Sequence, residues 1–200
     1  KGADLSEANL EGTSLLGLNL NGVNLSAVKL CSYTLDGVNL KGLNLSNLDL
    51  DFAELGNDLQ GVNLEGSCNL QFMNKSNLKE ANLKGADLSE RELIECDFSD
   101  ANLEGADLSN SELKGSNFSN ANLKGANLKG SNIEGVKFHN SNLENAIVPV
   151  EILEASLLGS NLSGIEIQNY KAKLFDRFYY DKFQLDLRGV TLSGIKLSNS

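Results

Sequence analysis

The chain contains no tryptophan and only one proline, one histidine and one methionine among its 200 residues. The single histidine, His139, provides too few ligands for a zinc site and has no partners for a catalytic triad. The glycines form no G-x-x-x-x-G-K-[ST] phosphate loop. No apolar run reaches the roughly 20 residues that a membrane-spanning helix needs. We therefore expect no catalytic residue, no metal site, no cofactor and no membrane segment in these residues.

Positive charge is also scarce, because 17 Lys and Arg residues stand against 27 Asp and Glu, for a net charge of −10. An acidic chain does not attract nucleic acid or anionic membranes, so we expect a protein partner instead. The cysteines are odd in number and scattered, at Cys31, Cys68 and Cys96. Such a set favours a reducing compartment over a disulfide framework. We expect the protein in the cytoplasm.

The most regular feature of the sequence is a repeat of five residues. Leucine or a substitute recurs at every fifth position from Leu5 to Leu55 and, in a second run, from Leu78 to Val148. A small residue lies two positions earlier and Asn or Asp lies between, so the unit reads A-(N/D)-L-x-x, as in "ANLKGANLKG". This period matches neither a helix, nor a flat strand, nor a heptad. A chain that buries two residues of every five must turn between units, and it winds into a solenoid whose coils pair about 4.8 Å apart.

Over most of its length the chain resembles the pentapeptide repeat family. The resemblance implies an all-β fold, a right-handed quadrilateral parallel β-helix with four pentapeptides per coil. In that fold the central Leu and the small residue point inward, and the other three residues point outward. In this register Cys68 and Cys96 occupy small inward positions, whereas His139 lies outside.

The first run of repeats departs from the small-residue rule. The position that should be small holds Leu18, Tyr33, Leu43 and Leu48. Either the coil widens locally to enclose these side chains, or they turn outward and make an apolar contact surface.

We expect residues 1–200 to form one β-helix domain with breaks at 56–77, 149–156 and 168–184. Between Leu55 and Leu78 the five-residue spacing slips, which predicts a bulge or a loop. In the second break, Pro149 is placed to open a short turn or helix. Because the repeats run to both ends without an evident polar cap, the chain is expected to be a module of a longer protein.

The third break, "NYKAKLFDRFYYDKFQL", has no pentapeptide pattern. Phe175, Phe178, Tyr179 and Phe183 share one face at helical spacing, which predicts a short aromatic helical insertion near the C-terminus. This helix either seals the rod or docks a second copy, giving a homodimer, or an adjacent domain of the same chain. The five-residue phase returns at Leu187.

Acidic residues concentrate in 86–112, which holds nine carboxylates and one cation, whereas 113–137 holds four cations and one carboxylate. With 20 residues per coil, Asp87 stacks under Asp107 and Glu92 under Glu112. These carboxylates wrap around several faces, which suits neither a general acid and base pair nor a metal site. The resulting belt either binds a basic partner or only keeps the rod soluble. The candidate partner-binding residues of the belt are Asp87, Arg91, Glu92, Asp97, Asp107 and Glu112.

Arg91 and one column of charged residues near the belt give two further predictions. Arg91 occupies a small inward position, where an unpaired charge is costly, so either the coil distorts or Arg91 pairs with a neighbouring carboxylate. Lys84, Glu104 and Lys124 should share one column of alternating charge, which offsets the repulsion elsewhere.

Two functions fit this sequence. The first is a non-catalytic protein-interaction scaffold, the substrate- or partner-binding module of a larger bacterial protein. The resemblance implies such rods in secreted effectors, and as part of an effector the protein would act inside a host cell. These effectors include ubiquitin ligases with a β-helix ahead of a HECT-like domain. On that reading the parent protein is an enzyme. The alternative is a DNA mimic that binds and protects DNA gyrase or topoisomerase against quinolones. The family's quinolone-resistance branch favours Phe at the repeat centre, whereas Leu dominates here.

Overall fold

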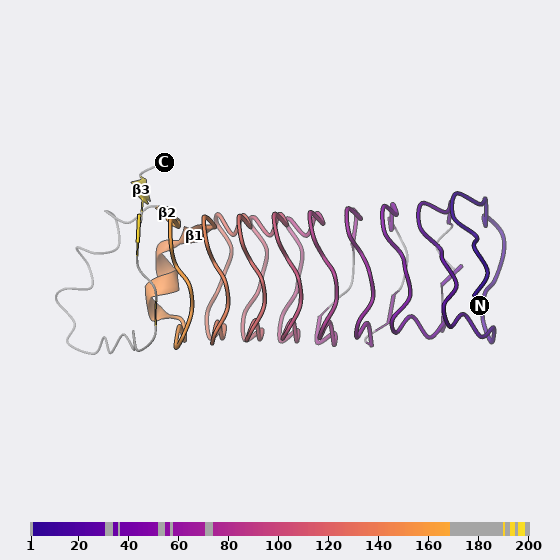
Figure 1. The fold of residues 1–200 in the computed structure, drawn as a ribbon, viewed down its shortest axis with the longest axis horizontal. Coiled ribbons are helices and arrows are strands. Elements are labelled where there is room, and N and C mark those ends of the chain that lie inside the picture. The colour runs from indigo at the N-terminus through magenta and orange to yellow at the C-terminus, as the bar shows by residue number, and fades with distance from the viewer. Residues whose placement is uncertain are drawn as a thin grey trace.

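The computed structural model describes residues 2–30, 34–35, 37–51, 55–56, 58–70, 74–168, 190, 193–194 and 196–198. Over these residues the chain winds into a rod of stacked coils, with the first coils at one end of the rod and β3 near the other (Figure 1). Parallel bridges join successive coils, most of them at steps of 20 residues, as from Asn82 to Asn102 and from Asn102 to Asn122. The predicted all-β fold, a right-handed quadrilateral parallel β-helix, is confirmed.

Each coil has four sides, and each side presents one outward residue that bridges to the neighbouring coils. In the coil that begins at Asn82 these residues are Asn82, Asp87, Glu92 and Asp97, and they define sides A, B, C and D in that order. The central residue that follows each of them is buried completely. These four central residues, each 0% exposed, are Leu83, Leu88, Leu93 and Phe98.

The second inward residue of each pentapeptide is small through the regular part of the rod. Examples on sides A and B, all buried, are Ala81, Ala86, Ala101, Ala106, Ala121 and Ala126. In the first run the coil encloses Leu43 and Leu48, which are 2% and 1% exposed, whereas Leu18 is 58% exposed. Both outcomes considered for these leucines therefore occur, and Tyr33 lies outside the described residues.

Three short strands pair in parallel on side B, in the order β1, β2, β3. Ile147 pairs with Glu166, and Glu166 pairs with Lys196. The strand bounds are β1 Ile147–Pro149, β2 Glu166–Gln168 and β3 Lys196–Ser198. The step from β2 to β3 is therefore longer than the others, and residues 169–184 of the segment predicted to hold the aromatic helix fall within it and outside the residues whose structure is described.

One short helix interrupts the pentapeptides. The 3-10 helix η1, Val150–Glu154, follows Pro149 directly and takes the place of a pentapeptide on side C. It is the short turn or helix predicted at Pro149, whose restricted φ suits the start of a helix. Its Ile152 is 0% exposed and fills the interior where a central Leu would lie. No helix among the described residues has the length and apolar character needed to cross a bilayer.

The break in spacing at 56–77 takes the form of shorter coils. Asn44 bridges Asn63 and Asn63 bridges Asn82, each a step of 19 residues. The described stretches 58–70 and 74–77 keep their bridges to the neighbouring coils. Each of these two coils has therefore lost one residue without losing the bridge network.

Tight turns join the sides of each coil. The N–H group three positions after a central residue donates to its carbonyl, as from Ala126 to Leu123 at 2.9 Å. The residue before that donor has positive φ, such as 67° at Gly125, which is the requirement of a type II turn. Glycine adopts this conformation freely and Asn tolerates it, whereas longer side chains are strained there. Three glutamates have this strained conformation in or directly before the coil that carries Arg91: Glu80, Glu90 and Glu95.

Replacing Gly125 by alanine should lower the free energy of unfolding by about 1–2 kcal/mol. A Cβ added at Gly125 meets nothing within 4 Å, so the loss arises from the left-handed backbone alone. Equilibrium urea unfolding followed by far-UV circular dichroism measures it. Gly125→Asn is the control, because Asn tolerates this conformation; a loss as large as that of alanine would contradict a backbone origin.

Candidate functional site

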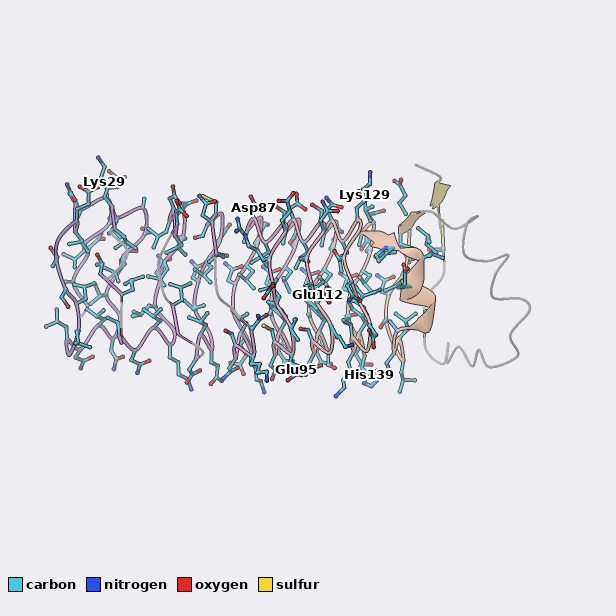
Figure 2. The ribbon with its side chains drawn as sticks, turned by 180° about the vertical axis from the view of Figure 1, so that it is seen from behind. Lys29, Asp87, Glu95, Glu112, Lys129 and His139 are labelled. Atoms are coloured by element: carbon cyan, nitrogen blue, oxygen red, sulfur yellow. The ribbon has the colours of Figure 1, made fainter. Side chains whose placement is uncertain are left out.

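The five predicted belt carboxylates lie on three sides of the rod. Asp87 bridges Asp107 on side B, Glu92 bridges Glu112 on side C, and Asp97 lies on side D. Figure 2 shows Asp87 at one edge of the rod and Glu112 on the face toward the viewer. The predicted stacking is confirmed: the acids follow the rod axis in columns, and they do not converge on a point. Among the described residues, no three His, Cys, Asp or Glu side chains gather closely enough to hold a metal ion.

A row of asparagines on side A shows how outward residues normally stack. The Nδ2 group of each Asn donates to the Oδ1 of the Asn one coil earlier, as from Asn122 to Asn102 at 3.1 Å. That Oδ1 also accepts the N–H group two residues later in its own turn, as from Glu104 to Asn102. The row runs from Asp4 through Asn24, Asn44, Asn63, Asn82, Asn102 and Asn122 to Asn142 and Asn161. A carboxylate, Asp4, thus accepts at the base of a row of amide donors.

Three of the belt carboxylates have the same role at the base of shorter rows. In each case the Nδ2 group of an Asn one coil later donates to the acid. The pairs are Asn117 to Asp97 at 3.0 Å, Asn127 to Asp107 at 3.0 Å and Asn132 to Glu112 at 2.6 Å. These asparagines were not predicted as partners of the belt, although each lies 20 residues after its acid and the coil length alone predicts the pairing.

Two steps in the belt break this rule, because an acid lies directly over another acid. On side B, Asp107 bridges Asp87, and on side C, Glu112 bridges Glu92. A carboxylate has no proton to donate to the one below, and two such charges at coil spacing repel by about 1 kcal/mol in water. We call these four residues, Asp87 and Asp107 with Glu92 and Glu112, the acidic rows.

The acidic rows are satisfied locally and not by ion pairs. The Ser89 hydroxyl donates to Asp87 Oδ1 at 2.6 Å and its N–H group donates at 3.0 Å. These bonds, with a smaller contribution from the Arg91 charge, hold the pKa of Asp87 below its ordinary value. Glu92 accepts from Asn74 Nδ2 at 3.1 Å. Within the described residues, none of the four carboxylates lies in an ion pair.

Other carboxylates of the rod do have cationic partners. Lys84 Nζ lies 3.6 Å from Glu104, and Lys124 Nζ lies 3.1 Å from Glu144. The predicted column of alternating charge, Lys84, Glu104 and Lys124, is thus confirmed beside side A. Such exposed pairs contribute little stability each. They place a cation beside each acid along this edge of the rod, which the acidic rows lack in the described part of the chain.

Arg91 lies inside the belt but is not neutralised there. Its side chain is partly buried, its Nε is buried without a hydrogen-bond partner, and within the described part of the chain it forms no ion pair. The charge of Arg91 acts on Asp87 without direct contact. The pairing considered for Arg91 is therefore absent among these residues.

The two described cysteines differ in environment, and the placement of one was predicted wrongly. Cys96 is 1% exposed, and burial raises the pKa of its thiol to about 11. Cys68 was expected inside, but it bridges Asp49 as an outward residue of side B, and Ser67 takes the inward position. Cys68 lies two residues before the buried Leu70, but it also lies five residues after the bridging Asn63, and that spacing makes it an outward residue. Burial, then the charges of Asp49 and Asp87, raise the pKa of the Cys68 thiol.

His139 lies outside the rod as expected. Its Nε2 lies within hydrogen-bonding distance of Ser156 Oγ. The aromatic residues proposed as a second contact surface, Phe175, Phe178, Tyr179 and Phe183, lie outside the described residues.

Asp107→Asn should raise the free energy of unfolding by about 1 kcal/mol. The new amide can donate to Asp87 as Asn117 donates to Asp97, and the repulsion between the two acids disappears. Its Oδ1 still accepts from Asn127. Thermal and urea unfolding measure the change. Asn122→Asp, which places a second acid in a row of amides, should lower the free energy of unfolding. A change of the same sign in both variants would contradict the stabilising role assigned to the stacked amides.

The fold and surface define a repeat scaffold, a solenoid with a continuous apolar interior and polar rows on its outside. Two sequence models match it: one described as pentapeptide repeats (8 copies) matches residues 3–30, and one described as a pentapeptide repeat region matches residues 71–147. Together they cover more than half of the chain, which belongs to the pentapeptide repeat family. No curated protein matches the chain.

The chain is similar to several solved structures of pentapeptide repeat proteins. A thylakoid lumen protein from Arabidopsis thaliana is 29% identical, with a TM-score of 0.39, over 48% of this chain and 64% of that one. HetL, involved in heterocyst differentiation regulation in the cyanobacterium Nostoc, is 22% identical over 95% and 87% of the two chains, with a TM-score of 0.27. The plasmid-mediated fluoroquinolone resistance protein QnrB1 is 16% identical over 98% and 94%, with a TM-score of 0.34. The chain thus spans less than two thirds of the length of the Arabidopsis protein.

Proposed function

We propose that this chain is a non-catalytic protein-binding scaffold whose acidic rows bind a basic segment of a partner protein. One observation carries the proposal: Asp107 lies over Asp87 and Glu112 over Glu92, and among the described residues no cation forms an ion pair with any of the four. At other steps, such as Asn117 over Asp97 or Lys84 beside Glu104, an amide lies over an acid or a cation lies beside one. The rows therefore hold negative charge that the fold does not need.

At the upper positions of the acidic rows the protein keeps a negative charge and gives up stability. An Asn at either upper position would donate to the acid below and remove the repulsion, as the side A row shows. A protein that keeps an acid there gives up stability, and such local losses are typical of surfaces kept for function. Lys or Arg of a partner would supply the missing donors and charge.

The test compares two variants, each with four carboxylates neutralised. The first is D87N/E92Q/D107N/E112Q, which removes the acidic rows. The second is E104Q/E134Q/E144Q/E95Q, which removes acids that are ion-paired in the structure. Binding of a fluorescent lysine-rich peptide is measured by anisotropy at low and physiological salt, and captured partners are compared by pull-down.

We expect the first variant to lose at least tenfold in affinity and most of the salt dependence. The second variant should bind within about twofold of the unaltered protein, because its acids were already paired. Both should remain folded by circular dichroism. Equal losses in the two variants would show that only net charge matters, and unchanged capture of every partner would overturn the proposal.

A finer form of the proposal places this rod in a larger bacterial protein, as the module that presents a substrate to a catalytic part. A secreted effector with a HECT-like ubiquitin ligase domain is one such parent. The parent protein with the acidic rows neutralised should then modify its substrate poorly but still form the ubiquitin thioester at normal rate. The Phe175, Phe178, Tyr179 and Phe183 segment is proposed as a second contact, to a neighbouring domain or another copy.

The second candidate function is mimicry of DNA toward gyrase or topoisomerase. It is supported by the arrangement of the acidic rows, which run along the rod axis on two neighbouring sides, as phosphates run along a duplex. Gyrase supercoiling, with and without a quinolone, tests it. Protection that disappears in D87N/E92Q/D107N/E112Q would favour mimicry, whereas no gyrase binding at low salt would exclude it.

A further inference from the structure

The bridge register changes twice within one part of the rod. On side A the step is 20 residues from Asn24 to Asn44 and 19 at each of the next two bridges, which end at Asn82. From Asn82 to Asn102 the step is 20 again. Two residues are therefore missing from two successive coils, and regular coils lie on both sides of them.

Bridges on the neighbouring sides place both losses on side C. Asp49 bridges Cys68 on side B and Asp58 bridges Asn77 on side D, each with a step of 19. The first loss thus lies between Asp49 and Asp58, and the second lies between Cys68 and Asn77. The later loss at η1 also falls on side C. We call the part of the rod between the two blocks of regular coils the seam; its described residues are 55–56 and 58–70.

The blocks on the two sides of the seam are built differently. In the N-terminal block, residues 2–51, the second inward position holds larger residues, including the buried Val23, Val28, Leu43 and Leu48. In the C-terminal block, residues 74–168, alanine is frequent there. Every ion pair among the described residues joins partners within 75–144. The phenylalanine stack at Phe98, Phe118 and Phe138 also lies in the C-terminal block.

The change at the seam should limit how cooperatively the rod unfolds. The stability of a solenoid is close to a sum of coil terms and nearest-neighbour interface terms, so a poorly matched interface divides it into separate units. On the two sides of the seam the second inward residues differ in size, and side C is one residue short in two coils, so these interfaces should be the weakest internal ones. We infer that the seam is a conformational joint at which the N-terminal block opens while the C-terminal block stays folded. This inference goes beyond the proposed function and requires no partner, although it keeps the acidic rows on the block that remains folded.

Two matched substitutions in the side A row test the joint. Asn63 lies in the seam, donating to Asn44 at 2.9 Å and accepting from Asn82 at 3.0 Å. Asn122 makes the same contacts inside the C-terminal block, with Asn102 and Asn142, each at 3.1 Å. Native-state hydrogen exchange of the unaltered chain, of Asn63→Ala and of Asn122→Ala is measured by mass spectrometry of peptides from each block.

In the unaltered chain we expect faster exchange in residues 2–51 than in the best protected part of 74–168. Asn63→Ala should speed exchange in the N-terminal block by about tenfold and leave the C-terminal block nearly unchanged. Asn122→Ala should speed exchange in the C-terminal block and leave the opening of the N-terminal block unchanged. The same factor in both blocks for both variants would overturn the joint. If Asn63→Ala does not fold, equal protection of the two blocks in the unaltered chain would overturn it instead.

Discussion

Replacing Phe118 by alanine is expected to lower the free energy of unfolding by about 3–5 kcal/mol. Phe118 is 0% exposed and lies between two other rings. Its centroid is 4.6 Å from that of Phe98, with planes 7° apart, and 5.5 Å from that of Phe138, with planes 18° apart. Bridges on side D hold all three coils at fixed spacing, so the interior cannot collapse onto the cavity. Guanidinium unfolding followed by far-UV circular dichroism measures the loss.

Phe118→Leu is the matched control. The coils at either end of the stack carry Leu78 and Leu157 at the equivalent buried position, so leucine fits this side of the rod. It fills most of the volume but loses the ring contacts, and we expect it to cost about 1–2 kcal/mol. If alanine cost no more than leucine, the stack would not be a major source of stability.

The second large effect is expected at Ser116, where alanine should cost about 2–3 kcal/mol. Ser116 is 0% exposed, and its hydroxyl lies in the turn of the preceding coil. It donates to the carbonyl of Leu93 at 2.6 Å and accepts the N–H group of Cys96 at 3.0 Å. Removing the hydroxyl takes away the donor to a buried carbonyl and the acceptor of a buried N–H group inside an apolar rod. Urea unfolding gives the change in stability.

Ser119→Ala is the control for Ser116, three residues away. The Ser119 hydroxyl donates to Asn117 Oδ1 at 2.7 Å at the partly exposed surface, where water can replace it. We expect a cost below about 0.5 kcal/mol. A similar cost for the two serines would contradict the structural role assigned to the buried hydroxyl.

The inside and outside of the rod could be predicted because one local rule sets both. Each pentapeptide buries its central residue and closes one turn, so counting by five places Leu83, Leu88 and Leu93 inside without knowledge of distant contacts. Counting by 20 then predicts which outward residues stack. The stacking of Asp87 under Asp107, and the shared column of Lys84 and Glu104, follow from that count.

Where the spacing of the leucines slips, the same rule misleads. Cys68 was placed inside because it lies two residues before Leu70, whereas its distance of five residues from Asn63 and its bridge to Asp49 place it outside. Counting by 20 places Asn127 over Asp107, and only the amide can donate, so this hydrogen bond could have been predicted but was missed. The seam depends on how neighbouring coils match in length and in the size of their inward residues, a property of packing that no single pentapeptide contains.

The alternating column beside side A repeats every second coil, whereas the backbone repeats every coil. Lys84 pairs with Glu104 and Lys124 pairs with Glu144, so two coils restore the same charge at the same place. A duplication of one coil would place like charges next to each other in this column, whereas a duplication of two coils would extend the rod and keep its alternation. The natural unit for lengthening this part of the rod, by recombination or by design, is therefore a pair of coils.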